Sequence, residues 1–305
     1  MRIFVTGASG WIGSAVVPEL LRAGHEVVGL ARSDASAKKV EASGAVPARG
    51  DLDDTDGLAK IAAESDGVIH LAFQHEIAFA GDFATASSTD REAVAAMGAA
   101  LAESGRPFVL ASGMLGLNVG RPATENDGLV VCEDSRNNPA SRRHATALFA
   151  LSLAGTGVRS SVLRLPPTVH GDGDNGFMAV FVGIARRSGI AGYVGDGSNR
   201  WPAVHVTDAG RLARLAVESA PAGSVLHAVA DEGVAFRRIA ETMGRHLGVP
   251  TGSVSPSDAV EHFAPLGRFA GLDSPSDASI TKELLGWEPT GPSLLEDLDQ
   301  AHYYR

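Results

Sequence analysis

The chain has 305 residues, of which 44% are hydrophobic and 20% are charged, a balance typical of a folded globular protein rather than a disordered one. Its 26 basic and 36 acidic residues give a net charge of −10, which argues against the broad basic surface that nucleic-acid binding requires. A single cysteine, Cys132, excludes an internal disulfide and a cluster of thiolate metal ligands.

The sequence contains no apolar run of the roughly 20 residues that span a bilayer. It opens on a strand pattern, MRIFVTG, rather than on a signal peptide. The low cysteine content suits a reducing compartment. We therefore expect a cytoplasmic protein that binds neither nucleic acid nor a membrane.

The first half of the chain alternates short apolar strands with helical patterns, which is typical of βαβ units around a parallel sheet. The predicted strands cover residues 1–7, 25–32, 45–51, 67–73, 106–113 and 159–166. The predicted helices between them cover residues 14–24, 57–66 and 90–105, and one further helix opens within NNPASRRHATALF at 137–149.

Beyond Pro166 the pattern loosens, and the loop-like clusters GDGDNGF, GDGSNRW and SPSDAV separate helices such as 177–189 and 236–248. No repeat or flexible linker interrupts the chain. The sequence therefore predicts an α/β fold, a doubly wound parallel sheet with a smaller C-terminal substrate lobe. We expect the lobe to cover mainly residues 166–305, with a part at about 190–220 returning to the first domain.

A glycine-rich turn, TGASGWIG, lies between the first predicted strand and the first helix. Glycines spaced three apart in this context allow a tight turn and bring backbone N–H groups close to a pyrophosphate at the helix N-terminus. An ordinary strand-to-helix turn is the alternative. We predict a Rossmann-type dinucleotide-binding domain over residues 1–165, with cofactor contacts from Gly7, Ser9, Gly10, Trp11, Ile12 and Gly13.

The end of the second predicted strand indicates which dinucleotide is bound. A carboxylate there would accept hydrogen bonds from the adenosine ribose and favour NAD(H). This chain has Arg32 and Ser33 instead, and a guanidinium with a hydroxyl suits a 2′-phosphate. We therefore favour NADP(H) over NAD(H), with Arg32 as a solvated loop arginine being the alternative.

Further segments, together with the glycine turn, resemble the extended short-chain dehydrogenase/reductase family, which includes nucleotide-sugar epimerases and dihydroflavonol reductases. The similar segments are GDLDD (50–54), HLAF (70–73), ATENDG (123–128), LRLPPTVHGDGD (163–174), AVHVTDAG (203–210) and LLGWEPTGPSLLEDL (284–298). The resemblance covers nearly the whole chain. It implies adenine contacts from Asp51 and Leu52, and contacts at the nicotinamide end from Leu71, Ala72, Phe73 and Pro166.

The chain departs from this family at the catalytic pair, Tyr-x-x-x-Lys. In the family the tyrosine is the general acid/base, and the lysine lowers its pKa and holds the nicotinamide ribose. The tyrosines of this chain are Tyr193, Tyr303 and Tyr304, and no lysine lies between residues 61 and 281. Aligning the two patterns puts Arg143 at the lysine position and Pro139 or Ala140 at the tyrosine position. The resemblance is therefore to an atypical member.

Four residues are candidates for the missing chemistry. Arg143 can position the cofactor but cannot exchange protons at neutral pH, or it is a surface arginine paired with Glu133 or Asp134. His144 can donate a proton, or it is a solvent-facing or packed helix residue. His170 replaces a common tyrosine of the family and is expected to contact substrate. Ser112 is the catalytic serine only if the best register, which favours Gly113, is shifted.

Three residues are expected in the substrate pocket. Gln74 and His75 follow the strand at 67–73, where they line the pocket or cap a loop. Trp201 stands where the family has an arginine that grips a nucleotide-sugar diphosphate, which favours an aromatic or hydrophobic substrate. We expect no metal, because turn chemistry accounts for the GDGD aspartates at 172 and 174.

The sequence thus supports two functions. The first is an NADP-dependent oxidoreductase that acts on a small carbonyl or related unsaturated substrate, with the proton from His144, His170 or water. The second is a non-catalytic NAD(P)-binding redox sensor or regulator. Members of the resembled family often pair as dimers through helices, and the apolar helices at 91–104 and 145–154 would allow a homodimer.

Overall fold

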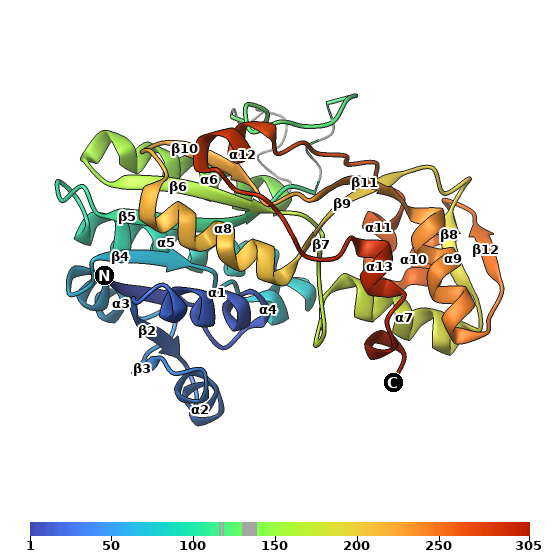
Figure 1. Cartoon of the computed structure of the whole chain (residues 1–305), viewed down its shortest axis with the longest axis horizontal. Coiled ribbons are helices and arrows are strands. Elements are labelled where there is room, and N and C mark those ends of the chain that lie inside the picture. The colour runs from blue at the N-terminus through green and yellow to red at the C-terminus, as the bar shows by residue number, and fades with distance from the viewer. Residues whose placement is uncertain (116, 118, 130–138) are drawn as a thin grey trace.

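A parallel β-sheet and the helices that cover it form the larger part of the molecule (Figure 1). The structure is a computed structural model that describes residues 1–115, 117, 119–129 and 139–305. In these residues seven strands pair in the order β10-β6-β5-β4-β1-β2-β3, all parallel. In sheet order they are Ser224–His227, Arg159–Leu165, Pro107–Gly113, Gly67–His70, Arg2–Thr6, Glu26–Ala31 and Val46–Arg49. The predicted α/β doubly wound sheet is confirmed.

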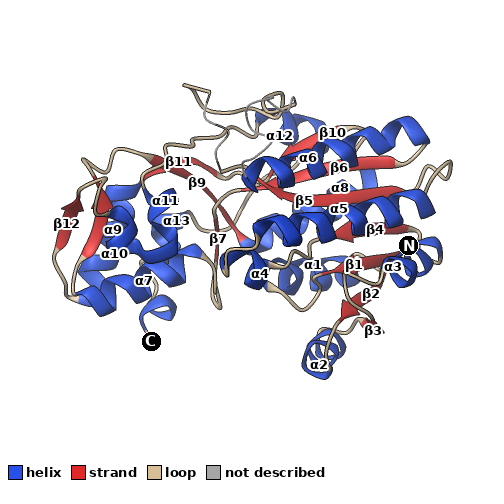
Figure 2. Ribbon diagram, turned by 180° about the vertical axis from the view of Figure 1, so that it is seen from behind, coloured by secondary structure: helices blue, strands red, loops and turns tan. Residues whose placement is uncertain are grey.

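Helices cover both faces of this sheet, which explains why its central strands β4 and β5 are buried along almost their whole length. Helices α1 (Trp11–Arg22) and α8 (Val206–Ser219) pack side by side on one face (Figure 1). Helices α3 (Thr55–Ala63), α5 (Phe83–Ala100) and α6 (Pro139–Ser152) cover the other face (Figure 2). Each layer buries its own apolar core against the strands.

Two shorter helices lie at the ends of strands of this sheet. Helix α2 (Asp34–Ala42) follows β2, and its start is fixed by a capping box between Ser33 and Ser36. Helix α4 (His75–Phe79) follows β4 and packs against α5. The sequence pattern did not predict either helix, because α2 is polar (DASAKKVEA) and α4 is only five residues long.

The C-terminal half supplies a second lobe with small sheets of its own. Strands β7 (Thr168–His170), β9 (Arg200–His205) and β11 (Asp231–Ala235) form one sheet, and β8 (Ala191–Val194) pairs with β12 (Thr251–Val254). The helices of the lobe are α7 (Phe177–Ser188), α9 (Phe236–Leu247), α10 (Ala259–Phe263), α11 (Gly267–Ala270) and α13 (Leu294–Leu298). Short 3-10 turns lie at Leu153–Thr156, Ala264–Leu266 and Ala301–Tyr304.

The chain crosses back to the larger sheet after β9. Helix α8, strand β10 and helix α12 (Ser279–Leu285) all pack on that sheet, and the Trp287 side chain joins its core. Strand β8, inside the range of about 190–220 expected to return, instead pairs within the lobe. No helix of the described residues is long and apolar enough to cross a membrane.

Candidate functional site

The carboxyl ends of the parallel strands meet along one edge of the large sheet. Thr6 at the end of β1 pairs in register with His70 at the end of β4, which in turn pairs with Leu110 of β5. From β1 the strand order runs outward in one direction through β2 and in the other through β4. A crevice between the ends of β1 and β4 is where ligands bind in sheets of this topology.

The glycine-rich turn occupies this crevice and is packed too closely for side chains. A Cβ atom on Gly7, whose φ is +70°, would lie 2.9 Å from the Ala72 nitrogen. A Cβ atom on Gly13 would lie 2.3 Å from the Gly7 carbonyl oxygen. Helix α1 begins at Trp11, directly after Gly10. In the described residues no side chain caps this helix start, and its first turn contains no acidic residue. The turn therefore leaves a backbone cradle that fits a dinucleotide pyrophosphate.

Within the turn, Ser9, Ile12 and Trp11 are partly buried. The indole Nε1 of Trp11 donates a hydrogen bond to the Val169 carbonyl oxygen at 2.8 Å. Trp11 thus links the cradle to β7 of the lobe through its side chain, and its contribution to a cofactor contact is left to its backbone.

The β2 end carries the residues expected at the adenosine ribose. Arg32 and Ser33 are both exposed; the Ser33 hydroxyl accepts from the Ser36 N–H at 3.2 Å, and Arg32 Nη2 lies 3.2 Å from a Glu76 carboxylate oxygen. Of the pair expected at the adenine, Asp51 is exposed and Leu52 is buried in the sheet core. Leu52 therefore packs the core with its side chain.

A buried polar chain supports the end of β4, and the sequence did not predict it. Thr6 Oγ1 accepts from the N–H groups of Leu71 and Ala72, each at 3.2 Å. Its own proton is then available to His70 Nδ1 at 2.7 Å, and His70 Nε2 lies 3.2 Å from an Asp90 carboxylate oxygen. This arrangement fixes the His70 ring and places a buried carboxylate under the site. A charged residue inside the apolar helix at 90–105 was the signal that could have revealed it.

Arg143 on α6 points to the same strand ends. Its Nη2 donates to the Ala111 carbonyl oxygen at 3.3 Å, and its guanidinium carbon lies 3.9 Å from the centroid of the Phe73 ring. Burial lowers the pKa of Arg143, and the charge of Asp90 acts in the opposite direction. The cation at the start of α6 is therefore held by an aromatic face and a carbonyl oxygen.

His144, the next residue on α6, faces another direction. A Cβ atom on Gly128 would lie 3.3 Å from its Cε1 atom and 3.4 Å from the Arg164 guanidinium. His144 thus lies against the segment near Gly128, whereas Arg143 lies against the β4 and β5 ends. Consecutive helix residues differ by about 100° around the axis, which explains the divergence. Cys132, Glu133 and Asp134 lie outside the described residues.

The end of β5 offers a buried serine and an open glycine. Ser112 is 6% exposed, whereas Gly113 is exposed and no described residue lies within 4 Å of a Cβ atom placed on it. The family's catalytic serine, if it stood at position 113, would therefore face open space here.

Residues 73 to 75 form the rim of the site beside Arg143. The Phe73 ring lies 5.1 Å from the His75 ring and 5.7 Å from the Phe83 ring. Gln74 Oε1 is buried, and no described residue donates a hydrogen bond to it. An acceptor in this state can receive a hydrogen bond from a hydroxyl or amide of a bound molecule.

The charge state of His75 follows from these neighbours. Desolvation and the Arg143 cation lower the pKa of His75 from 6.5 to about 4. We expect its imidazole, followed by NMR, to titrate near pH 4 and to shift toward 6.5 in Arg143→Met. Because the unfolded state binds this proton up to about pH 6.5, His75 makes stability fall as the pH drops from 6.5 to 4. An unchanged titration in Arg143→Met would show that the two side chains do not interact.

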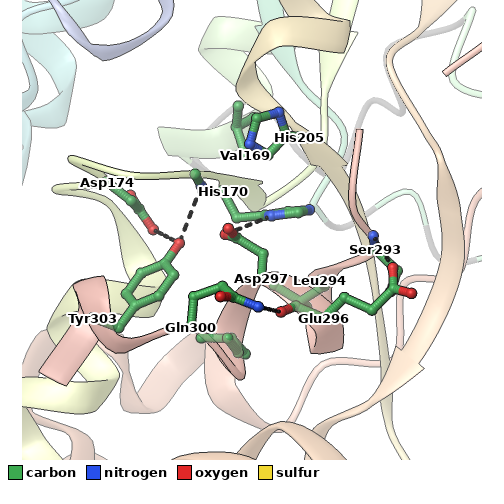
Figure 3. Close-up of polar contacts among 12 residues, drawn as sticks. Val169, His170, Asp174, His205, Ser293, Leu294, Glu296, Asp297, Gln300 and Tyr303 are labelled. Atoms are coloured by element: carbon green, nitrogen blue, oxygen red, sulfur yellow. Dashed lines mark hydrogen bonds and ion pairs between the residues drawn. The ribbon is translucent and has the colours of Figure 1, made fainter. Parts of the chain in front are cut away.

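His170, which the sequence predicts to contact substrate, is fully buried, and its Nδ1 lies 2.9 Å from Asp297 Oδ2 on α13 (Figure 3). Beside it the Tyr303 hydroxyl donates to Asp174 at 3.0 Å and accepts from the Gly171 N–H at 3.2 Å (Figure 3). His170 thus holds the C-terminal segment, because β7 turns it toward α13. Pro166 is buried just before β7.

Trp201 is likewise not a wall of a pocket. It is fully buried in the aromatic core of the lobe, 5.1 Å from the Phe236 ring and 5.7 Å from the Phe181 ring. Its Nε1 donates to the Leu272 carbonyl oxygen at 3.0 Å. The alignment that placed Trp201 opposite a ligand-binding arginine could not reveal that its side chain turns inward on β9.

Trp201→Ala is expected to cost about 3–5 kcal/mol of unfolding free energy, because it empties a fully buried aromatic site. Urea unfolding followed by circular dichroism measures the loss. Arg200→Ala is the matched control. Arg200 precedes Trp201 on β9, is exposed and pairs with Asp273, and such a pair contributes about 0–1 kcal/mol. Equal losses in the two variants would contradict the burial of Trp201.

A second buried charge cluster joins the 123–128 segment to the C-terminal region. Glu125, 3% exposed, accepts from the Thr281 N–H at 2.8 Å and from its hydroxyl at 2.5 Å. Arg164 donates to the Asp127 carbonyl oxygen at 2.8 Å. These contacts account structurally for the ATENDG and LRLPP segments.

No group of three or more His, Cys, Asp or Glu in the described chain is arranged to hold a metal ion.

Comparison with known proteins places these features in a wider group. Residues 3–228 match the model of the NAD dependent epimerase/dehydratase family. An uncharacterized protein of Schizosaccharomyces pombe is 43% identical over 304 residues, which are 100% of both chains. A Stigmatella aurantiaca protein, 4-hydroxy-2-methyl-3-oxo-4-farnesyl-3,4-dihydroquinoline-1-oxide ketoreductase, is 30% identical over 228 residues, 74% of this chain and 67% of its own.

Among solved structures, a dTDP-glucose 4,6-dehydratase from Streptomyces venezuelae, with NAD and TYD bound, superposes with a TM-score of 0.79. The match covers 100% of this chain and 97% of the other at 22% sequence identity, so it demonstrates a shared fold.

Proposed function

This chain belongs to the NAD dependent epimerase/dehydratase family, and from that premise we propose that it is an NADP-dependent oxidoreductase that acts on a small carbonyl or related unsaturated compound. The observation that carries the proposal is the Arg143 guanidinium, held between the ends of β4 and β5 beside the glycine cradle. A cation fixed there is suited to stabilise the negative charge that develops on a carbonyl oxygen.

When the dinucleotide is bound, its nicotinamide supplies a hydride to the carbon that is reduced. Gly7 and Gly13 accommodate the pyrophosphate, and Arg32 and Ser33 suit a 2′-phosphate. Arg143 orients the nicotinamide end and stabilises developing oxygen charge, while the Phe73 ring and the Ala111 carbonyl hold its guanidinium in place. Arg143 cannot itself deliver a proton near neutral pH.

The proton must come from another group. His75 is neutral above about pH 5, given a pKa of about 4, so its protonated form is scarce at neutral pH. His170 is fully buried and paired with Asp297, so we do not propose it as the donor. His144 lies against the segment near Gly128 rather than at the strand ends, so solvent water is the proposed donor.

The surroundings favour a hydrophobic substrate over a sugar nucleotide. The rim contains the aromatic rings of Phe73 and Phe83. Trp201, at the position expected to grip a diphosphate, is buried in the lobe core and offers no cation. The ketoreductase relative acts, by its name, on a 3-oxo group of a farnesylated dihydroquinoline, which supports a carbonyl substrate for this chain.

Titration of the purified protein with NADPH and with NADH, followed by a panel of aliphatic and aromatic carbonyl and enone substrates, tests the proposal. We expect tighter binding of NADPH and oxidation of NADPH by at least one class of carbonyl. His144→Ala should leave kcat within about twofold of the wild-type value, because its imidazole lies against the Gly128 segment. A loss of about 10²-fold would instead assign the proton to His144.

The second candidate function is a redox sensor or regulator that binds the dinucleotide without turnover. The absence of the Tyr-x-x-x-Lys pair from the sequence is the observation that favours it. Tight NADPH binding with no turnover of any compound in the panel would establish this alternative.

A further inference from the structure

Two exposed arginines lie side by side at the ends of adjacent strands, and each is already paired with a carboxylate. Arg49 closes β3, in register with Ala31, the residue before Arg32. Arg49 pairs with Asp34 at the start of α2. Arg32 pairs with Glu76 of α4 through Nη2 and Oε2, 3.2 Å apart. Both pairs therefore lie where the sequence predicts the adenosine ribose.

The Glu76 contact differs from the Asp34 contact in what it joins. Asp34 and Arg49 lie on the same βαβ unit, 15 residues apart. Glu76 comes from α4, 44 residues from Arg32 and on the other side of the cofactor crevice. The Arg32–Glu76 pair thus connects the β2 side of the crevice with the β4 side at the adenosine end.

A phosphate at the ribose 2′ position would compete with Glu76 for Arg32. The guanidinium presents a planar set of N–H donors that suits either a carboxylate or a phosphate. Both partners of the existing pair are solvent-exposed, with 59% and 82% of their side-chain surfaces accessible. Such a pair is weak, so a dianionic phosphate can displace it. A ribose with a free 2′-hydroxyl carries no charge and leaves the pair in place.

We propose that Glu76 sets the preference of this protein between NADP and NAD by occupying Arg32 whenever no 2′-phosphate is bound. The proposal rests on the proposed function, because it assumes that a dinucleotide occupies the crevice. Glu76 lowers the affinity for NADPH, which must break the pair, and it leaves the affinity for NADH unchanged. It is a specificity-determining residue that touches neither the nicotinamide nor the substrate.

Through the Arg32–Glu76 contact, the rim of the site also responds to which dinucleotide is bound. Glu76 follows directly on Gln74 and His75, whose ring lies against Phe73 beside Arg143. NADPH releases α4 from Arg32, and NADH does not. The amides of α4 therefore exchange hydrogen faster in the NADPH complex than in the NADH complex.

Calorimetric titration of Glu76→Gln tests this directly. We expect the NADPH dissociation constant to fall about three- to fivefold, the effect of one exposed ion pair, with no change for NADH. Arg32→Gln should weaken NADPH binding about tenfold or more. In the double variant the Glu76→Gln change should have no further effect. Hydrogen exchange of α4 in the two wild-type complexes gives a second readout that is independent of turnover.

The matched control is Glu26→Gln at the opposite end of β2. Glu26 pairs with Arg2 at 3.3 Å on the exposed far edge, so its removal changes net charge equally and should leave both dissociation constants unchanged. Tighter binding of NADPH and NADH alike in Glu76→Gln, or an undiminished effect in the Arg32→Gln background, would overturn the proposal. Wild-type protein that binds neither dinucleotide would instead overturn the proposed function, and this inference with it.

Discussion

Gly13→Ala is expected to abolish dinucleotide binding, with a loss of affinity of about 100-fold or more. The added methyl group would lie 2.3 Å from the Gly7 carbonyl oxygen and 2.5 Å from the Ala8 carbonyl oxygen, and both are backbone atoms. The turn must therefore open, which moves the N–H groups that face the pyrophosphate. Isothermal titration with NADPH and with NADH measures the effect, since the pyrophosphate is common to both cofactors.

The matched control is Gly155→Ala, because no described residue lies within 4 Å of a Cβ atom placed on Gly155. Circular dichroism spectra of the two variants separate a local change in the turn from loss of the fold. A folded Gly13→Ala protein that binds NADPH with unchanged affinity would contradict the assignment of this turn as the pyrophosphate site.

Arg143→Met is expected to lower kcat/KM by about 10²–10³-fold, the usual effect of removing one donor to a developing oxyanion. Methionine keeps the aliphatic part of the side chain and removes the guanidinium, and with it the charge, the contact with the Phe73 ring and the hydrogen bond to the Ala111 carbonyl. Steady-state oxidation of NADPH with the best substrate of the panel measures the loss.

Arg142→Met provides the control, because Arg142 is the adjacent residue of α6 and is exposed. It should leave kcat/KM within about twofold of the wild-type value, as is usual for an isolated surface charge. Arg143→Lys should recover part of the lost rate, since it restores the charge without the planar set of donors. Equal effects of the Arg142 and Arg143 substitutions would show that only net charge matters.

Most of the large sheet can be predicted from sequence, because its central strands are mostly apolar and its first turn is marked by Gly7, Gly10 and Gly13. Helix α2 could not be, because its formation depends on the Ser33–Ser36 capping box and on the edge of β3 rather than on an apolar stripe. Strand β10 was missed because it is only four residues long and is defined by its pairing with β6.

Side-chain direction limited the prediction of the site. The spacing from the strand at 159–165 predicts that Arg143 positions the cofactor, and in the structure its guanidinium lies against Ala111. His144, one residue later, faces another surface of α6. His170 lies on a strand of three residues, too short for a period-2 pattern to indicate which face is buried. Partners from distant segments, such as Asp297 and Asp90, become visible only when the chain is folded.

Trp11, which donates a hydrogen bond to β7, is an intrinsic fluorescent probe at the boundary between the cradle and the lobe. Of its three tryptophans, Trp201 and Trp287 are 0% and 1% exposed in apolar cores, while Trp11 is partly exposed within the glycine turn. Emission from the red edge of the protein spectrum should therefore come mainly from one indole. Its quenching would follow both the arrival of a dinucleotide and any separation of β7 from the turn, without an added dye.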